Sequence, residues 1–123
     1  MSQELTNRII KHKAKIGVIG IGYVGLPLAI ELARVGFSVC GIDIDKNRIA
    51  SLNNAKSYIL DIPDKEIRPL VGQKRLSATS DYKVLKGFDV IIICVPTPLG
   101  KTKQPDISHI VQATEHVAKF MRK

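Results

Sequence analysis

The chain has 123 residues and a mass of 13.5 kDa, which is the size of one small domain. Hydrophobic residues make up 45% of it and the mean hydropathy is +0.07, which excludes a disordered chain and a membrane bundle. The net charge of +8 decides little by itself, but only three Phe, three Tyr and no Trp accompany it, so we expect no specific nucleic-acid partner.

The longest uncharged run covers residues 16–30 and contains four glycines and Pro27. It is too short and too rich in glycine for a membrane-spanning helix. The charged residues Glu31 and Arg34 follow it where a secretion signal would carry a cleavage site of small residues. We therefore expect a cytoplasmic protein with no membrane partner.

Residues 1–13 are polar and basic and are predicted to form an N-terminal arm, either loose or a short helix. The remainder, residues 14–123, alternates between the short apolar runs of buried strands and the periodicity of helices. Four strands are predicted, over residues 15–19, 38–42, 75–79 and 89–95. Helices are predicted over residues 23–35 and 46–53, with at most a short one over 81–86.

Two stretches rich in proline are predicted to be irregular. Residues 57–69 are assigned at most a turn of helix after Pro63, and residues 96–105 form a loop. The last element is a helix with Asp106 as its N-cap. Its apolar stripe is predicted to consist of Ile110, Val111, Thr114, Val117, Ala118 and Met121.

Strands that are apolar throughout and alternate with helices are typical of a parallel sheet covered on both faces. The sequence therefore predicts an α/β, doubly wound (Rossmann-type) fold with a mostly parallel sheet. A complete fold of this kind has about six strands. Because only four are predicted, we expect the domain to be truncated after the fourth strand and its helix.

The cysteines and histidines predict neither a disulfide nor a metal site. Cys40 and Cys94 each lie within an apolar strand-like run, which indicates buried, reduced thiols. His109 and His116 are seven residues apart on the last helix, about 10 Å along its axis, which is too far to bind one metal ion directly.

A Gly-x-Gly-x-x-Gly motif lies directly after the first predicted strand and opens the first predicted helix, the context that a phosphate-binding loop requires. Gly20 permits a tight turn, Gly22 lets the backbone approach a pyrophosphate, and Gly25 allows close packing of helix and strand. The helix N-terminus would offer free N–H groups to the phosphates. Candidate cofactor-binding residues here are Gly20, Ile21, Gly22, Tyr23, Val24 and Gly25.

An acid at the end of the second strand completes the pattern. Asp43 follows Gly25 by 18 residues, where a carboxylate accepts hydrogen bonds from the adenosine ribose. Such a carboxylate repels a 2′-phosphate, so the predicted cofactor is NAD in preference to NADP. Asp45 adds to this preference, and Lys46 and Arg48 weaken it slightly.

Longer strings of these residues resemble the UDP-glucose/GDP-mannose dehydrogenase family. The resemblance is carried by residues 16–29 around Gly-Tyr-Val-Gly-Leu-Pro, by Gly-Ile-Asp-Ile-Asp at 41–45 with Arg48-Ile49, and by Val-Pro-Thr-Pro at 95–98. Members of this family oxidise the C6 alcohol of a nucleotide sugar to a carboxylate with two NAD per turnover. The resemblance thus implies NAD and a UDP-sugar as ligands.

The resemblance also implies roles for individual residues. Gly20 to Gly25 would hold the pyrophosphate, Asp43 the ribose, and Arg48 would lie beside the adenosine. Thr97, next to Pro96 in the loop after the fourth strand, would contact the cofactor near its nicotinamide half. Residues 57–63, 98–99 and 105–108 resemble the bacterial UDP-N-acetylglucosamine 6-dehydrogenases, with an N-acetylmannosamine-type relative as the alternative.

The sequence departs from the family in what it lacks. The catalytic cysteine of the family lies in a Gly-Gly-His-Cys-like stretch, and neither Cys40 nor Cys94 has such neighbours. The later site residues and the sugar-binding domain are also absent. We therefore expect this chain to contain no catalytic residue, to bind cofactor and not to turn over substrate.

Two other functions remain open from the sequence. One is a stand-alone NAD-sensing module of the potassium-channel regulator type, against which the Val-Pro-Thr-Pro string counts. The other is electrostatic adhesion to nucleic acid, which would weaken steeply with salt. A homo-oligomer is also possible, because an uncovered sheet edge invites pairing with a second chain.

Overall fold

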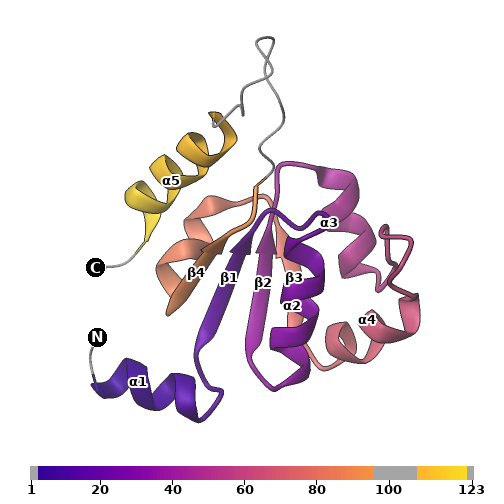
Figure 1. Ribbon diagram of the computed structural model, residues 1–123, viewed down its shortest axis with the longest axis horizontal. Coiled ribbons are helices and arrows are strands. Elements are labelled where there is room, and N and C mark those ends of the chain that lie inside the picture. The colour runs from indigo at the N-terminus through magenta and orange to yellow at the C-terminus, as the bar shows by residue number, and fades with distance from the viewer. Residues whose placement is uncertain (1–2, 96–107, 122–123) are drawn as a thin grey trace.

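The computed structural model describes residues 3–95 and 108–121, and its centre is a parallel four-stranded sheet (Figure 1). The strands lie in the order β3-β2-β1-β4. Their bounds are β1 Lys15–Ile19, β2 Ser38–Ile42, β3 Leu76–Thr79 and β4 Val90–Ile93. β1 and β2 have the predicted bounds, whereas β3 and β4 are shorter than predicted.

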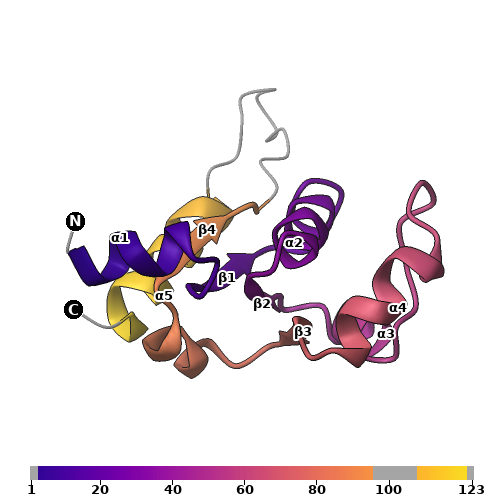
Figure 2. The ribbon, with the colours of Figure 1, turned by 90° about the horizontal axis from the view of Figure 1, so that it is seen from below.

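Helices cover the sheet and its ends. Their bounds are α1 Gln3–Ile10, α2 Gly25–Arg34, α3 Lys46–Asn53, α4 Asp64–Gly72, the 3₁₀ helix η1 Tyr82–Gly87 and α5 Ser108–Phe120. Seen from below, α2 lies on one side of the sheet, and η1 and α5 lie on the other (Figure 2). The predicted α/β, doubly wound fold is thus confirmed.

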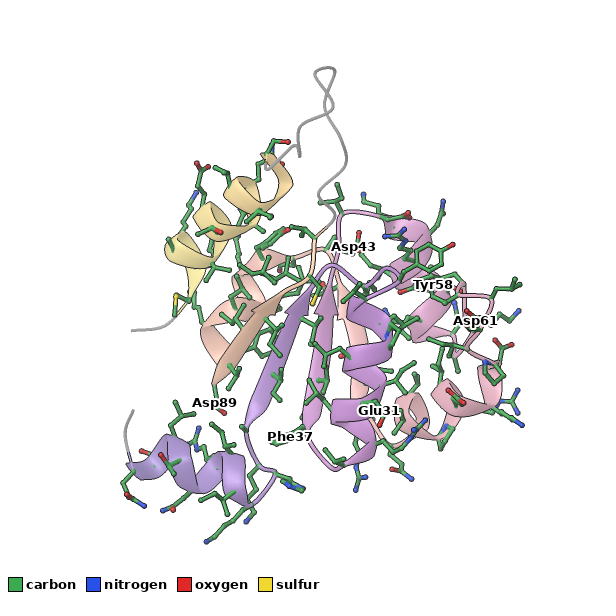
Figure 3. The ribbon with its side chains drawn as sticks, in the orientation of Figure 1. Glu31, Phe37, Asp43, Tyr58, Asp61 and Asp89 are labelled. Atoms are coloured by element: carbon green, nitrogen blue, oxygen red, sulfur yellow. The ribbon has the colours of Figure 1, made fainter. Side chains whose placement is uncertain are left out.

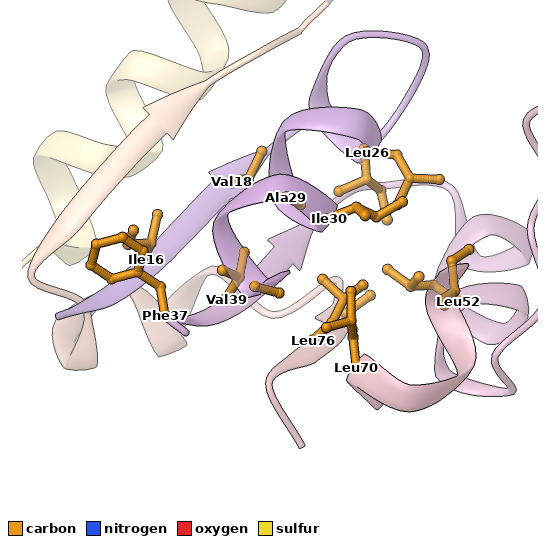
Figure 4. Packing of buried hydrophobic residues seen from close by; sticks show 14 of the residues in the cluster. Ile16, Val18, Leu26, Ala29, Ile30, Phe37, Val39, Leu52, Leu70 and Leu76 are labelled. Atoms are coloured by element: carbon orange, nitrogen blue, oxygen red, sulfur yellow. The ribbon is translucent and has the colours of Figure 1, made fainter. Parts of the chain in front are cut away.

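Alternation along the strands builds a core on each face of the sheet. In β1, Ile16 and Val18 face α2, and Ile19 faces η1 and α5. The larger core joins α2 to the sheet and to residues of α3 and α4, including Leu52 and Leu70 (Figure 4). Both faces of these strands are therefore buried, which is why they are apolar throughout.

The strand order places a topological switch at β1. The chain runs from β1 out to β2 and β3, and then returns to the other side of β1 for β4. β1 pairs with both neighbours, so that Ile16 lies opposite Val39 on one side and Val90 on the other. Ligands of doubly wound sheets bind beyond the carboxyl ends of the strands at such a switch.

Residues 57–69 were predicted to be irregular with a turn of helix after Pro63, and this was wrong in extent, because a full helix, α4, occupies Asp64–Gly72. Pro63 is the N-cap of this helix, and Pro69 lies inside it. The helix is amphipathic, with Ile67 and Leu70 buried against the larger core, but the two prolines made this pattern hard to recognise in the sequence. Burial of this face outweighs the hydrogen bond that Pro69 cannot donate.

The predicted face of α5 was only partly right, because Val117 packs against the smaller core whereas other residues of the predicted stripe are exposed. Ala113 is buried, and Val117 and Phe120 pack against the smaller core, whereas Ile110 and Met121 are exposed. The His116 ring stacks on Tyr82 of η1 at 4.2 Å between ring centroids. The contact is thus made by a second stripe, in which the small Ala113 allows close approach to the sheet. The predicted cap Asp106 and the predicted loop 96–105 lie outside the described residues.

The N-terminal arm is a helix, α1, that is tied to the amino end of the sheet. Arg8 Nη1 lies 2.9 Å from Oδ1 of Asp89, whose other oxygen accepts the Lys15 N–H. Asp89 lies at the end of β4 that is nearer to α1 (Figure 3). His12 Nδ1 lies 2.7 Å from the Val35 carbonyl oxygen. Among the described residues, no helix is long and apolar enough to cross a membrane.

Candidate functional site

The glycine motif forms the turn between β1 and α2, at the carboxyl edge of the sheet. Gly20 has φ = +90°, a conformation that favours glycine. A Cβ at this position would lie 2.5 Å from the carbonyl oxygen of Cys94, at the end of β4. The Gly20 N–H donates to the Ile42 carbonyl at 2.7 Å, which fastens the turn to β2.

Gly25 is the first residue of α2, and it brings the helix against the turn. A Cβ on Gly25 would lie 1.6 Å from the carbonyl oxygen of Gly20. Only glycine permits this approach of two backbone segments. The structure therefore gives Gly25 the close helix–strand packing that the motif predicts.

Gly22 faces the side chain of Arg48. The nearest atoms to a Cβ built at Gly22 belong to the guanidinium of Arg48, the closest at 3.4 Å. The N-cap of α2 is Val24, which makes no side-chain cap hydrogen bond, and the Tyr23 and Val24 side chains are exposed. The loop thus presents backbone, without a Cβ on Gly22, at a helix N-terminus, which suits an anionic group.

Asp43 joins the glycine motif to the end of β2. Its Oδ2 accepts the Ile21 N–H at 3.0 Å, and its Oδ1 accepts the Asp45 N–H at 2.9 Å. The residue is 8% exposed. A carboxylate offers about four lone-pair directions, and these two backbone N–H groups use two of them. Asp43 thus retains acceptor capacity for ribose hydroxyls.

Arg48 lies beside this carboxylate on α3. Its Nη1 is 3.5 Å from Asp43 Oδ2, and its Nε is 3.7 Å from Asp45 Oδ2. Asp45 is the N-cap of α3 and accepts the N–H groups of Asn47 and Arg48. This cap holds the start of α3 so that Arg48 reaches Asp43.

Tyr58 belongs to the same cluster and was not among the predicted site residues. Its hydroxyl donates to the Ile21 carbonyl at 2.5 Å, and its ring centroid lies 5.9 Å from the Arg48 guanidinium carbon. Burial raises the pKa of Tyr58, an effect that the charge of Arg48 opposes. Residues 57–63 carried part of the family resemblance, but no local pattern predicts this contact, because Tyr58 reaches the loop from a segment 37 positions further along the chain.

A hollow of about 390 Å³ lies next to these groups. Its lining comes from the glycine motif, from the start of α3 and from the segment before α4. The lining residues are Tyr23, Asp45, Asn47, Arg48, Ser51, Tyr58 and Ile59.

The structure thus brings together Gly20 to Gly25, Asp43 and Arg48. The predicted candidates Pro96 and Thr97 lie outside the described residues. Cys40 and Cys94 are free thiols that are half-buried rather than fully buried, and burial raises the pKa of each. Within residues 3–95 and 108–121, no group of three or more His, Cys, Asp or Glu side chains is placed to hold a metal ion.

The model of the UDP-glucose/GDP-mannose dehydrogenase family, NAD binding domain, matches residues 14–123. The chain belongs to this family. Its cofactor is therefore NAD, and the glycine motif and Asp43 lie where a doubly wound sheet binds a dinucleotide. Helix α1 precedes the matched residues.

Similar curated proteins are nucleotide-sugar dehydrogenases. The UDP-N-acetyl-D-glucosamine 6-dehydrogenase of Pseudomonas aeruginosa is 38% identical over 109 residues, which are 89% of this chain and 25% of that protein. The UDP-N-acetyl-D-mannosamine dehydrogenase of Pyrococcus horikoshii is 37% identical over 108 residues, 87% of this chain and 26% of that protein. The chain thus spans about a quarter of the length of the curated relatives it matches.

Solved structures of the family share the fold. The UDP-D-ManNAc dehydrogenase of Pyrococcus horikoshii matches with a TM-score of 0.81 and 37% identity, over 87% of this chain and 26% of that one. A ternary complex of GDP-mannose dehydrogenase from Pseudomonas aeruginosa matches with a TM-score of 0.79 and 32% identity, over 83% and 24%. The sensing-module alternative gains no support from these matches.

Proposed function

We propose that this chain is the NAD-binding part of a UDP-sugar 6-dehydrogenase, which oxidises the C6 alcohol of its substrate to a carboxylate with two NAD. The observation that carries the proposal is the direct hydrogen bond between Asp43 and the Ile21 N–H inside the glycine motif. It joins the ribose-binding acid and the phosphate loop into one unit at the switch point of the sheet.

In this proposal, the residues of the unit contact different parts of the cofactor. Gly20 to Gly25 hold the pyrophosphate, Asp43 holds the adenosine ribose, and Arg48 lies beside the adenosine. Pro96 and Thr97 complete the site toward the nicotinamide. Bound NAD supplies the hydride acceptor for oxidation of the alcohol.

The charges around the ribose position favour NAD over NADP. Asp43 and Asp45 both lie at the end of β2, and a 2′-phosphate placed there would meet two carboxylates. Arg48 does not reverse this preference, because its guanidinium lies within 4 Å of both carboxylates and is largely neutralised by them.

The substrate that we propose is UDP-N-acetylglucosamine, with UDP-N-acetylmannosamine as the alternative. Names of relatives support both, since the 38% identical protein acts on the first and the 37% identical protein on the second. Residues 14–123 then form a partial dinucleotide-binding domain, in a cytoplasmic enzyme whose catalytic and sugar-binding domains lie outside this chain. This chain alone would bind NAD without turnover.

Calorimetric titration of the folded chain with NAD and NADP tests the proposal. We expect NAD to bind at least tenfold more tightly than NADP, and no NADH to form when either UDP-sugar is added. A folded chain that binds neither dinucleotide would contradict the proposed function. Light scattering with and without NAD tests the sensing module, which requires a dimer that responds to the nucleotide.

A further inference from the structure

We infer that Tyr58 is a positioning residue of the phosphate loop: its hydroxyl sets the orientation of the Ile21–Gly22 peptide, and its ring supports Arg48. The inference rests on the proposed NAD-binding function and adds a residue to it. Tyr58 and Asp43 lie at the same edge of the sheet (Figure 3). Neither the glycine motif nor the acid that follows β2 predicts a contribution from the segment before α4.

Ile21 is held from three sides. Its N–H donates to Asp43, its carbonyl accepts from the Tyr58 hydroxyl, and its side chain is fully buried. The side chain fills the space above Gly41 in β2, where an added Cβ would lie 2.4 Å from Ile21 Cγ2. Of these three contacts, only the bond from Tyr58 acts on the peptide that leads into Gly22.

A trans peptide is planar, so its carbonyl and its N–H point in opposite directions. The hydrogen bond that fixes the Ile21 carbonyl therefore also fixes the direction of the Gly22 N–H. Gly22 has no Cβ to restrict its backbone, so this peptide rotates easily unless an outside group holds it. Tyr58 supplies that group and keeps the Gly22 N–H in one orientation before a pyrophosphate arrives.

The ring of Tyr58 has a second contact, with Arg48. The guanidinium carbon lies 5.9 Å from the ring centroid, within the range of a cation–π interaction. The same guanidinium pairs with Asp43 and Asp45. The hydroxyl of Tyr58 thus acts on the pyrophosphate end of the site, and the ring acts on the adenosine end.

The segment that carries Tyr58 is itself fixed. The Ser57 N–H donates to Oδ1 of Asp64 at 2.7 Å, which ties the segment to the first turn of α4. The Ser57 hydroxyl donates to the Ile59 carbonyl at 3.0 Å. Tyr58 is therefore held in place from both sides, and it does not depend on the ligand for its position.

Binding of NAD, ADP and adenosine to three variants tests the inference. Tyr58→Phe keeps the ring and removes the hydroxyl, and Tyr58→Leu removes both. Thr114→Val is the matched control, because it removes a hydroxyl hydrogen bond on α5, from Thr114 to the Ile110 carbonyl, without touching the glycine motif or the segment that carries Tyr58. Thermal melts confirm that each chain is folded at the temperature of the titration.

We expect Tyr58→Phe to weaken NAD and ADP, which contain the pyrophosphate, about three- to tenfold, the effect of one net hydrogen bond. Adenosine should change less than twofold. Tyr58→Leu should weaken all three ligands, because Arg48 loses its support, and Thr114→Val should leave all three within twofold. In the unaltered chain, hydrogen exchange of the Gly22 amide should slow with ADP and not with adenosine.

Several results would overturn the inference. If the unaltered chain binds NAD and Tyr58→Phe binds all three ligands equally well, Tyr58 has no positioning role, although the proposed function stands. Equal losses for NAD, ADP and adenosine in Tyr58→Phe would indicate a general effect on stability. A Gly22 amide indifferent to ADP would contradict the inference even if Tyr58→Phe failed to fold. No NAD binding by the unaltered chain would remove the proposed function and this inference together.

Discussion

The contact between Gly25 and Gly20 leaves no room for a side chain. We expect Gly25→Ala to lower the free energy of unfolding by at least about 3 kcal/mol, because its Cβ would lie 1.6 Å from a backbone oxygen that cannot move aside. Urea denaturation measures the loss.

Gly72→Ala is the matched control for that substitution. A Cβ at Gly72, the last residue of α4, meets no atom within 4 Å. Alanine should therefore raise the free energy of unfolding by about 0.5–1 kcal/mol, through helix propensity and a less flexible unfolded chain. Equal losses at the two glycines would refute the steric argument.

Asp43 governs which dinucleotide the site accepts. Asp43→Asn keeps the volume of the side chain but loses the negative charge, and it turns one of the two acceptors, toward either the Ile21 or the Asp45 N–H, into a donor. We expect NAD to bind about 10- to 100-fold more weakly, while NADP loses less. The ratio of the two dissociation constants is the measurement, and an unchanged ratio would show that Asp43 does not set the preference.

The sequence was sufficient for some residues of the site and not for others. The backbone roles of Gly20 and Gly25 were predictable, because a tight turn and close helix packing require glycine at fixed distances from a strand end. The place of Asp43 after β2 was predictable as well, while its contact with the ribose stays a prediction. Tyr58 was not predictable, since its role depends on where the segment before α4 folds back. Residues that are far apart in the sequence and meet only in the folded chain leave no local sequence pattern.

The ion pair between Arg8 and Asp89 anchors helix α1 to the sheet. The Asp89 side chain is 2% exposed, so removing a partner leaves a buried carboxylate less well satisfied. We expect Arg8→Ala to cost about 1–3 kcal/mol of unfolding free energy, measured by urea denaturation.

Arg34→Ala is the comparison for this prediction. Arg34 pairs with Glu31 and Glu66 at the surface, where all three side chains are 40% exposed or more. Such pairs contribute about 0–1 kcal/mol. A loss in Arg8→Ala no greater than that in Arg34→Ala would mean that α1 is not held by its ion pair.

Elements with a single apolar pattern were predicted well, and those with competing patterns were not. Strands β1 and β2 are continuous apolar runs, and their bounds follow from the sequence. The full length of helix α4 was missed, because Pro69 is unfavourable inside a helix and the burial of Ile67 and Leu70 cannot be seen in the sequence. In α5 two apolar stripes compete, and only the surface of the sheet decides between them.

For the whole molecule, two tyrosines make the free energy of unfolding depend on pH in the alkaline range. Burial raises the pKa of Tyr58 and of Tyr82 above their ordinary value of 10.0, and the charge of Asp43 raises that of Tyr82 further. Above pH 10 the tyrosines of the unfolded chain therefore lose protons that the folded chain retains. The contribution of the two tyrosines to the free energy of unfolding is lost as the pH rises through their folded-state pKa values.

We expect the free energy of unfolding to fall between pH 9.5 and about 11.5, and to fall less steeply in Tyr58→Phe. Urea denaturation across this range makes the comparison, and the lysines common to both chains cancel in the difference. Parallel curves for the two chains would contradict the raised pKa of Tyr58.

The fold class was predictable from the sequence, but the order of the strands was not predicted. Doubly wound sheets occur in more than one strand order, and the structure shows that this one is β3-β2-β1-β4. The docking of α1 was not predictable, because an arginine in a basic arm gives no sign that its partner is Asp89, 81 positions away.

The position of β1 between β2 and β4 has a consequence for how the chain folds. One neighbour of β1 follows it closely, whereas the other begins at Val90, so the centre of the sheet is closed by the most distant pairing it contains. Contacts of this separation slow folding, because the intervening chain must be ordered first. On the ribosome, β1, β2 and β3 would emerge and associate with one side of β1 still open. Gly20 packs closely against the backbone of Cys94, just after β4. The phosphate loop would therefore take its final shape only after β4 has paired with β1.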